Sequence, residues 1–276
     1  MPFALTFLGT GCDYSSKDRE VTCILVECGY DKVLLDCCPG ILRQLDAINI
    51  DPIEIGSIFL SHTHGGHFLG FPLFIFGSLP KGRKDPLLVM APEGMKRVID
   101  TVLDLIYPKY MKAVRQRFEI EISEIDTGGF SEKKINDRIK ITTAPIDHDI
   151  PTLGCCLEFL DYGIKIAYSS DTRKCKNMET LAKNANFLIH DATFEHAAVK
   201  WAEERAHSTV RQAAEIARDA SVEVLILVHM HHTRYDRENI EKLYLKEAKE
   251  VFNGEVLIPK DLNKVDLFSY STVAKT

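Results

Sequence analysis

Short apolar runs rich in β-branched and aromatic residues recur along the whole chain, separated by polar segments. Each run is bounded by Gly, Pro, Asp or Asn, a pattern typical of strands that end in turns. Two hairpins are expected, one turning at Gly29-Tyr30-Asp31 and one at Asp161-Tyr162-Gly163. The predicted strands cover residues 5–8, 23–26, 33–35, 58–60, 87–90, 139–143, 164–168, 187–189, 224–228 and 256–258.

Helical periodicity is found in fewer segments. Residues 95–106 repeat Val98, Val102 and Ile106 and stop before Pro108, and residues 209–220 and 239–252 show the same spacing, the former behind Ser208 as a helix cap. No linker, low-complexity tract or internal repeat interrupts the pattern. The sequence therefore predicts one layered α/β domain over residues 1–276, with helices covering the faces of sheets.

Composition adds limits to this fold class. The 276 residues are 45% hydrophobic and 27% charged, as in ordinary globular proteins that bury a substantial core. A net charge of -6 argues against an extensive, nonspecific nucleic-acid footprint, although it leaves room for a local basic patch. No apolar run is long enough to cross a bilayer, and eight cysteines without a CxxC spacing indicate reduced thiols, so we expect a soluble cytoplasmic protein that does not engage membranes.

The stretch LSHTHGGHFLG at residues 60–70 carries the strongest chemical signal. His62 and His64 point to the same side of an extended segment, so both imidazoles can reach one cation. His67 begins the following apolar stretch and can turn back toward the same point. The alternative is a chance cluster of surface histidines, but a strand that runs directly into three histidines favours a metal site.

The ends of other predicted strands carry further ligand types. His148, Asp171 and His229 each follow a strand. A lone histidine or aspartate in such a place is more often a structural residue or a cap. Because the theme is repeated, these side chains point to one shared metal site of the kind that zinc prefers.

These segments, in this order, resemble the metallo-β-lactamase superfamily and, within it, ribonuclease Z and its phosphodiesterase relatives. The similarity extends over nearly the whole chain, and HDATF and AHST are similar to segments that separate ribonuclease Z from the wider superfamily. The matching segments are FLGTG at 7–11, DCCPG at 36–40, LSHTHGGHFLG at 60–70, HDIPTLG at 148–154, SDTR at 170–173, HDATF at 190–194, AHST at 206–209, and His229 followed by Arg234-Tyr235.

The resemblance implies a four-layer αββα sandwich with a two-metal centre. Zn²⁺ is the expected metal, with Mn²⁺ and Fe²⁺ as alternatives, and a homodimer is the expected assembly. His207, oriented by Asp191, would protonate the departing ribose oxygen, while Ser208, Thr209 and Arg234 would contact the substrate. In the carried-over ligand set, His62, His64 and His148 hold the first metal, Asp171 bridges, and His67 and His229 hold the second.

The chain departs from the family pattern at Gly66, where the family has an aspartate that ligates the second metal and orients the attacking water. The second metal is therefore expected to bind more weakly. His231 or His232 could compensate, or could be solvated loop histidines. Gly66 could be natural or engineered.

A second departure concerns the substrate. Only 22 residues separate His148 from Asp171, too few for the long arm with which bacterial-type ribonuclease Z enzymes grip tRNA. Cations at 81–84 and 109–117 could replace the arm, but a solvated charged face is the favoured account of both segments.

The sequence thus favours a metal-dependent phosphodiesterase that cleaves RNA or small phosphodiesters. One alternative is a catalytically impaired protein of the same fold with a binding role. Another is a lactone or thioester hydrolase, for which segments 190–194 and 207–209 would have no evident use.

Overall fold

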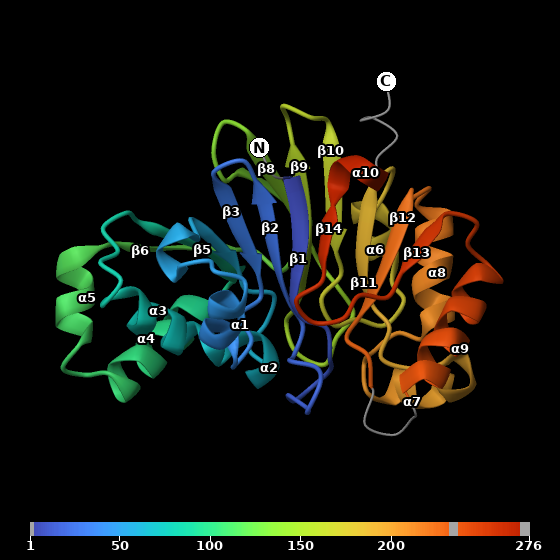
Figure 1. The fold of residues 1–276 in the computed structure, drawn as a ribbon, viewed down its shortest axis with the longest axis horizontal. Helices are drawn as coiled ribbons and strands as arrows, with labels where there is room; N and C mark the ends of the chain where they lie inside the picture. Colours follow the sequence, from blue (N-terminus) through green and yellow to red (C-terminus); the bar gives the residue numbers. More distant parts are fainter. Residues whose placement is uncertain (1–2, 232–236, 271–276) are drawn as a thin grey trace. The chain divides into compact units, whose positions relative to one another are not determined.

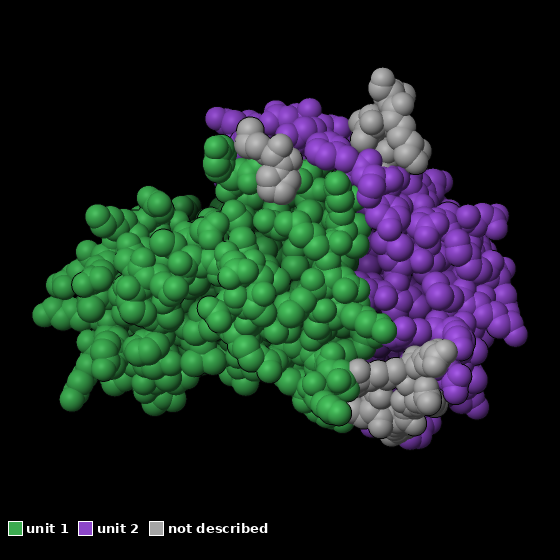
Figure 2. All heavy atoms as spheres, in the orientation of Figure 1, with its two compact units in different colours: residues 1–126, 260–267 green, residues 127–259, 268–276 purple. Residues whose placement is uncertain are grey.

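The computed structural model describes residues 3–231 and 237–270. The chain forms two compact units, which Figure 2 distinguishes by colour. The first unit comprises residues 1–126 and 260–267, and the second comprises residues 127–259 and 268–276. The expectation of a single domain over residues 1–276 stays a prediction.

The first unit is built on a seven-stranded mixed sheet with the order β14-β1-β2-β3-β4-β5-β6. Strands β1, β2, β3 and β14 pair antiparallel, and β3 to β6 pair parallel. The strands are β1 (Phe3–Gly9), β2 (Cys23–Cys28), β3 (Asp31–Leu35), β4 (Ser57–Phe59), β5 (Leu87–Pro92), β6 (Ile120–Ile125) and β14 (Lys264–Asp266).

Helices of the first unit bury one apolar stripe against this sheet. Leu34, Ile58 and Val89 of the central strands share a core with Phe71 and Phe74. Burying one such side chain is worth about 1.5–3 kcal/mol, so this contact stabilises the unit. The helical elements are α1 (Ile41–Ala47), η1 (Pro52–Glu54), α2 (Gly65–Phe68), α3 (Gly70–Ser78), α4 (Met95–Ile106) and α5 (Met111–Arg117).

The second unit contains another seven-stranded sheet, with the order β13-β12-β11-β10-β9-β8-β7. Its strands β7 to β10 pair antiparallel, whereas β10 to β13 pair parallel. The strands are β7 (Ser131–Lys134), β8 (Ile139–Pro145), β9 (Leu153–Phe159), β10 (Ile164–Tyr168), β11 (Phe187–Asp191), β12 (Val224–Val228) and β13 (Glu255–Leu257).

Figure 1 shows α8 and α9 running beside β12 and β13. Ala213, Ala214 and Ala217 of α8 face Leu188 and Leu225 in one buried cluster, where small side chains let the helix approach the sheet closely. The helical elements are α6 (Lys176–Leu181), η2 (His196–Ala198), α7 (Val199–Glu204), α8 (Val210–Asp219), α9 (Arg237–Lys249) and, at the end of the described chain, α10 (Leu267–Tyr270). Within the described chain, no helix combines the length and apolarity that membrane crossing requires.

Most predicted elements are confirmed, and β10, β12 and α4 have the predicted bounds. Strands β6, β7, β9 and β14 are absent from the predicted strands, although the hairpin expected at residues 161–163 implies a strand before β10. Strand β7 reads SEKK and carries no apolar signal. The prediction of Ser208 as a helix cap is wrong. Thr209 is the N-cap of α8. Its hydroxyl accepts from the Gln212 N–H at 3.3 Å, and the Gln212 side-chain oxygen accepts from the Thr209 N–H at 2.9 Å.

Candidate metal centre and general acid

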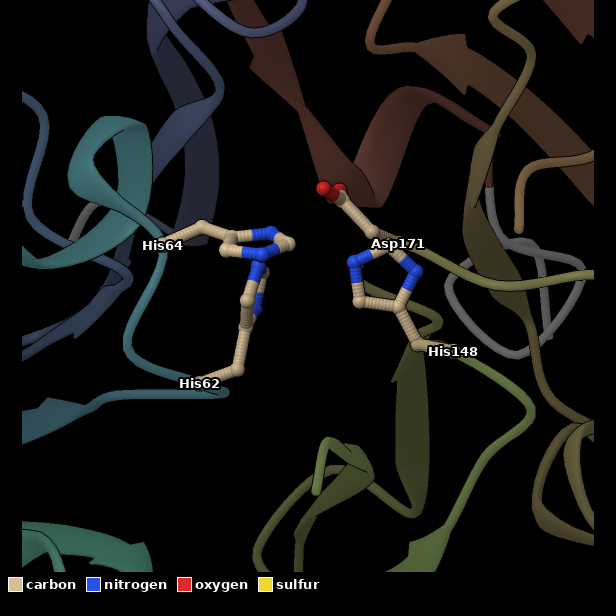
Figure 3. Close-up of side chains that lie close together, drawn as sticks. All are labelled: His62, His64, His148 and Asp171. Atoms are coloured by element: carbon tan, nitrogen blue, oxygen red, sulfur yellow. The ribbon is translucent and has the colours of Figure 1, made fainter. Parts of the chain in front are cut away.

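Three histidines of the first unit gather where β4 ends. His62 and His67 are buried and His64 is half-buried. The chain leaves β4 extended and then turns into α2, which brings His67 back toward His62. The ring centroids of His62 and His64 are 4.8 Å apart, with the rings edge to face (Figure 3). Those of His62 and His67 are 4.3 Å apart. The structure thus brings the three predicted ligands of this segment together.

Asp36, directly after β3, fixes the orientation of two of these rings. Its fully buried carboxylate accepts from Ser61 N–H at 2.7 Å, from Ser61 Oγ at 2.8 Å and from His67 Nδ1 at 2.8 Å. Because the Ser61 hydroxyl donates to Asp36, its lone pair accepts from His62 Nδ1 at 2.9 Å. Both neutral rings therefore carry the proton on Nδ1 and the lone pair on Nε2, which is the form that binds a metal.

Gly66 lies in α2 immediately before His67. A Cβ atom built on Gly66 would lie 2.5 Å from Val21 Cγ1 and 3.4 Å from the Asp13 carbonyl oxygen. A side chain at residue 66 therefore requires Val21 to move. Val21 and the Asp13 carbonyl pack closely against Gly66. An aspartate at residue 66, as in the family pattern, therefore has no space unless Val21 moves.

Four side chains of the second unit converge at one edge of its sheet. Asp171, Asp191 and His229 follow or end β10, β11 and β12, which are parallel neighbours, so their carboxyl ends meet at the same edge. These three residues and His207 are buried, and one potential ligand atom of each lies within 4.8 Å of the others. Two carboxylates and two imidazoles so close together form a donor set that suits a divalent cation.

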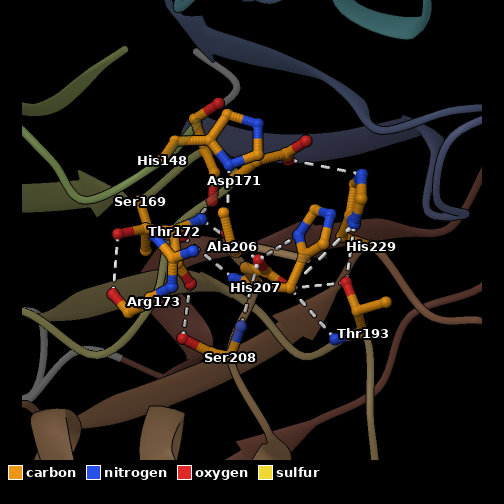
Figure 4. Close-up of polar contacts among 12 residues, drawn as sticks. His148, Ser169, Asp171, Thr172, Arg173, Thr193, Ala206, His207, Ser208 and His229 are labelled. Carbon is orange, nitrogen blue, oxygen red and sulfur yellow. Dashed lines mark hydrogen bonds and ion pairs between the residues drawn. The ribbon is translucent and has the colours of Figure 1, made fainter. Parts of the chain in front are cut away.

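Asp191 orients both histidines of this cluster. Figure 4 shows His207, His229 and Thr193 close together. One carboxylate oxygen accepts from His207 Nδ1 at 2.8 Å, and the other accepts from Thr193 Oγ at 2.7 Å. Thr193 Oγ in turn accepts from His229 Nδ1 at 2.8 Å. Burial raises the pKa of Asp191, but the neighbouring His207 and His229 outweigh burial and hold the pKa below its ordinary value. The carboxylate therefore stays ionised. Because Nδ1 of His207 and of His229 is hydrogen-bonded, Nε2 of each ring is the nitrogen that can bind a metal or transfer a proton.

Asp171 and His148 complete the predicted residues of this unit (Figure 3). Asp171 Oδ1 lies 3.3 Å from His229 Nε2. His148 Nδ1 donates to the Ala206 carbonyl at 2.9 Å, and its Nε2 lies 3.1 Å from the exposed carboxylate of Asp149. The Ala206 bond occupies Nδ1 and so leaves Nε2 as the nitrogen that could bind a metal.

Left-handed backbone is concentrated at these positions. Asp36, Ser170, Ala206 and His229 have φ values of 60°, 52°, 59° and 62°. Non-glycine residues in this region are strained by about 1–3 kcal/mol each, and such strain is found preferentially at functional sites. Here it aims the Asp36 carboxylate, the Ala206 carbonyl and the His229 ring at their partners.

The predicted substrate contacts are less clearly placed. Ser208 and Thr209 are fully buried, with Ser208 Oγ donating to the Thr172 carbonyl at 2.6 Å and Thr209 capping α8. Their contact with substrate stays a prediction.

Arg234 and His232 lie outside the described residues. His231 stacks on Phe194 with a centroid distance of 6.0 Å and belongs to no metal-ligand group among the residues described.

Three of the candidate cations at 81–84 and 109–117 are engaged within the first unit. Arg83 is 2% exposed and donates to the carbonyls of Pro52 and Ile55, so its prediction as a surface cation is wrong. Lys81 and Arg115 form ion pairs with aspartates at 3.0 and 3.1 Å. In place of the long arm, the interval between His148 and Asp171 holds the tight β9-β10 hairpin.

Sequence reasoning assigned no role to Asp36, Ser61, Thr193 or the Ala206 carbonyl. Asp36 stands at a strand end before a Cys-Cys-Pro-Gly turn, and that position is a signal for a positioning carboxylate. His190 is also buried, and burial lowers its pKa; its Nδ1 bonds to the Asp191 carbonyl at 2.8 Å.

Comparisons with known proteins agree with this geometry. Residues 31–230 match the Beta-lactamase superfamily domain. The chain is 30% identical to the ribonuclease Z of Methanothermobacter thermautotrophicus, over 97% of this chain and 98% of that one. The structure is similar to the short form of human tRNase Z, with a TM-score of 0.78, 23% identity and coverage of 96% and 99% of the two chains.

It is also similar to the metallo-beta-lactamase fold protein YhfI of Bacillus subtilis, with a TM-score of 0.75, 19% identity and coverage of 96% and 99%. These likenesses confirm the predicted α/β fold class of the metallo-β-lactamase type. The match to the superfamily domain and the identity over nearly the full length carry the classification. The chain belongs to the beta-lactamase superfamily and, within it, to the ribonuclease Z family.

Proposed function

We propose that this chain is a metal-dependent phosphodiesterase that hydrolyses RNA. The observation that carries the proposal is the Asp191-His207 pair, buried beside Asp171 and His229. A general acid held within a set of metal ligands suits hydrolysis of a phosphodiester, where the departing alkoxide needs a proton. The family relatives named ribonuclease Z support RNA as the substrate class.

We propose that ligands from both units bind one metal centre. In this proposal His62, His64, His148 and Asp171 would hold one ion, and Asp171, His67 and His229 would hold a second, weaker one. Zn²⁺ is the proposed metal, because imidazole nitrogens and a carboxylate are its common ligands. When bound, the ions supply a hydroxide at neutral pH and neutralise charge on the phosphoryl group.

The chain's own residues handle the proton. His207 gives the proton at Nε2 to the departing ribose oxygen as its bond to phosphorus breaks. Asp191, ionised and bonded to Nδ1, stabilises the imidazolium form that precedes this transfer. This role resembles that of an aspartate behind a catalytic histidine, which fixes the tautomer without itself taking the proton.

Gly66 favours a second candidate, a protein of the same fold that binds RNA or metal but turns over slowly. Glycine offers no ligand atom, so the proposed second metal would have one ligand fewer than the family pattern provides. Val21 also occupies the space that a side chain at residue 66 would need. A lactone or thioester hydrolase has less support, because segments 190–194 and 207–209, which are similar to those of ribonuclease Z, have no evident use in such an enzyme.

The proposal extends to assembly and location. The family resemblance supports a homodimer, and seven buried thiols among the eight cysteines fit a reducing compartment such as the cytoplasm. Sedimentation of the purified protein tests the first statement, and localisation of a tagged chain tests the second.

The decisive assay uses an RNA with a 3′ extension and the small diester bis(p-nitrophenyl) phosphate, each with Zn²⁺ or Mn²⁺. We expect metal-dependent cleavage of both, abolished by a chelator and by Asp171→Asn. If neither substrate is cleaved but RNA still binds, the binding protein becomes the supported function in place of the hydrolase. Cleavage of a lactone panel alone would overturn the phosphodiesterase assignment.

A further inference from the structure

We propose that Trp201 and Arg205 form a stacking site for an unpaired base of the RNA substrate. The site would take the nucleotide on the departing side of the scissile phosphate. The inference rests on the proposed function, since it names how the same site holds its substrate. No part of the metal centre or of the general acid includes either residue.

The two residues share one face of a short helix. Trp201 lies in α7 and Arg205 follows its last residue, so the side chains are four positions apart and adjacent on the helix surface. The guanidinium carbon lies 5.8 Å from the indole centroid. The indole nevertheless remains 46% exposed. A large flat ring that one cation steadies and solvent reaches is suited to stacking on a base.

The local charges complement a phosphate backbone. No described residue forms an ion pair with Arg205 or with the exposed Lys200. Glu203, by contrast, lies 3.7 Å from the Arg173 guanidinium and accepts from Gln212 Nε2 at 3.0 Å. Arg205 can therefore attract phosphate oxygens while its planar group stays against the indole. Glu204 is exposed on the same helix, and its negative charge would repel the phosphate oxygens.

Backbone bonds connect this face directly to the general acid. His207 N–H donates to the Ala202 carbonyl at 2.9 Å, and Arg205 N–H donates to the Trp201 carbonyl at 3.1 Å. The intervening Ala206 accepts from His148. The end of α7 is thus fixed to the residue that protonates the departing oxygen, so a nucleotide attached to that oxygen lies beside Trp201 and Arg205.

The sequence contains a single tryptophan, so indole fluorescence reports on this site alone. The test titrates a short single-stranded oligoribonucleotide into protein kept free of metal with a chelator, which prevents hydrolysis. We expect saturable quenching of the indole emission, and weaker quenching by a blunt RNA duplex, whose bases are already stacked. Absence of quenching by the single strand would overturn the site.

Variants are compared by fluorescence anisotropy of a labelled oligoribonucleotide. Trp201→Ala should raise Kd by about 5- to 150-fold, the range of one lost base stack, and Trp201→Phe by less. Arg205→Ala should raise Kd and Glu204→Gln should lower it. The matched control is Leu160→Ala, which removes a side chain 44% exposed at the opposite end of β9 and β10 and should leave Kd unchanged.

An unchanged Kd in folded Trp201→Ala protein would overturn the inference, with folding checked by circular dichroism. Failure of the proposed function gives a different pattern. If metal-loaded protein cleaves no phosphodiester but Trp201→Ala still weakens RNA binding, the stacking site stands and the hydrolase assignment falls.

Discussion

His67 Nδ1 donates a hydrogen bond to the buried carboxylate of Asp36 at 2.8 Å, across 31 residues of sequence. The same carboxylate holds Ser61, which in turn accepts from His62. One strand-end aspartate thus sets the tautomer and the orientation of two candidate ligands. Asp191 has the equivalent role in the second unit, where it holds His207 directly and His229 through Thr193.

Replacing Asp36 tests this positioning role. In Asp36→Asn, the amide oxygen retains one acceptor while the NH2 group faces a donor, so Ser61 and His67 cannot both keep their bonds. We expect metal affinity to fall about 10- to 100-fold, measured by competition with a chromophoric chelator. Asp46→Asn, at an exposed position of α1, is the control. Unchanged affinity in folded Asp36→Asn protein would contradict the role.

His207→Gln tests the general acid. The rate on RNA should fall by about 10²- to 10⁴-fold, because the departing ribose oxygen no longer receives a proton. Hydrolysis of bis(p-nitrophenyl) phosphate should fall far less, since p-nitrophenolate leaves without protonation. His196→Gln, at an exposed histidine of η2, should leave both rates unchanged. Equal losses on both substrates would assign His207 to metal binding or structure instead.

Residue 66 allows a double-variant test. Gly66→Asp places Cβ 2.5 Å from Val21 Cγ1, an overlap that should cost about 1–3 kcal/mol of unfolding free energy. Val21→Ala in the same chain should recover part of this loss and allow the carboxylate to increase retention of the second metal. Denaturant unfolding and metal content measure the two effects. A single variant as stable as the parent would show that Val21 moves at no cost.

Thiol reactivity tests the packing around the cysteines. Seven of the eight are buried, and burial raises the pKa of Cys156 to about 12, so its thiolate is scarce at neutral pH. Cys175 is the partly exposed exception. Ellman's reagent should therefore modify Cys175 rapidly in the native protein and the remainder only after denaturation. Rapid native reaction of Cys37 or Cys38 would contradict the structure.

Periodicity and turn residues were sufficient to predict most central strands, because a buried strand has a short continuous apolar run bounded by turn residues. They failed for β7, whose four polar residues pair with β8 through backbone bonds alone. The candidate metal ligands were recognisable from their types at strand ends. Asp36, Thr193 and the Ala206 carbonyl were not, since their partners are distant in sequence and a backbone carbonyl carries no residue signature.

The account depends most on ligands from both units binding the same metal centre. Metal content per chain, measured by elemental mass spectrometry after dialysis of untagged protein, tests this directly in the parent and in His62→Ala and His229→Ala. We expect the parent to retain at least one equivalent of zinc, and a variant in either unit to lose metal while remaining folded. A parent without bound metal, or variants that retain the parent's full content, would contradict the account.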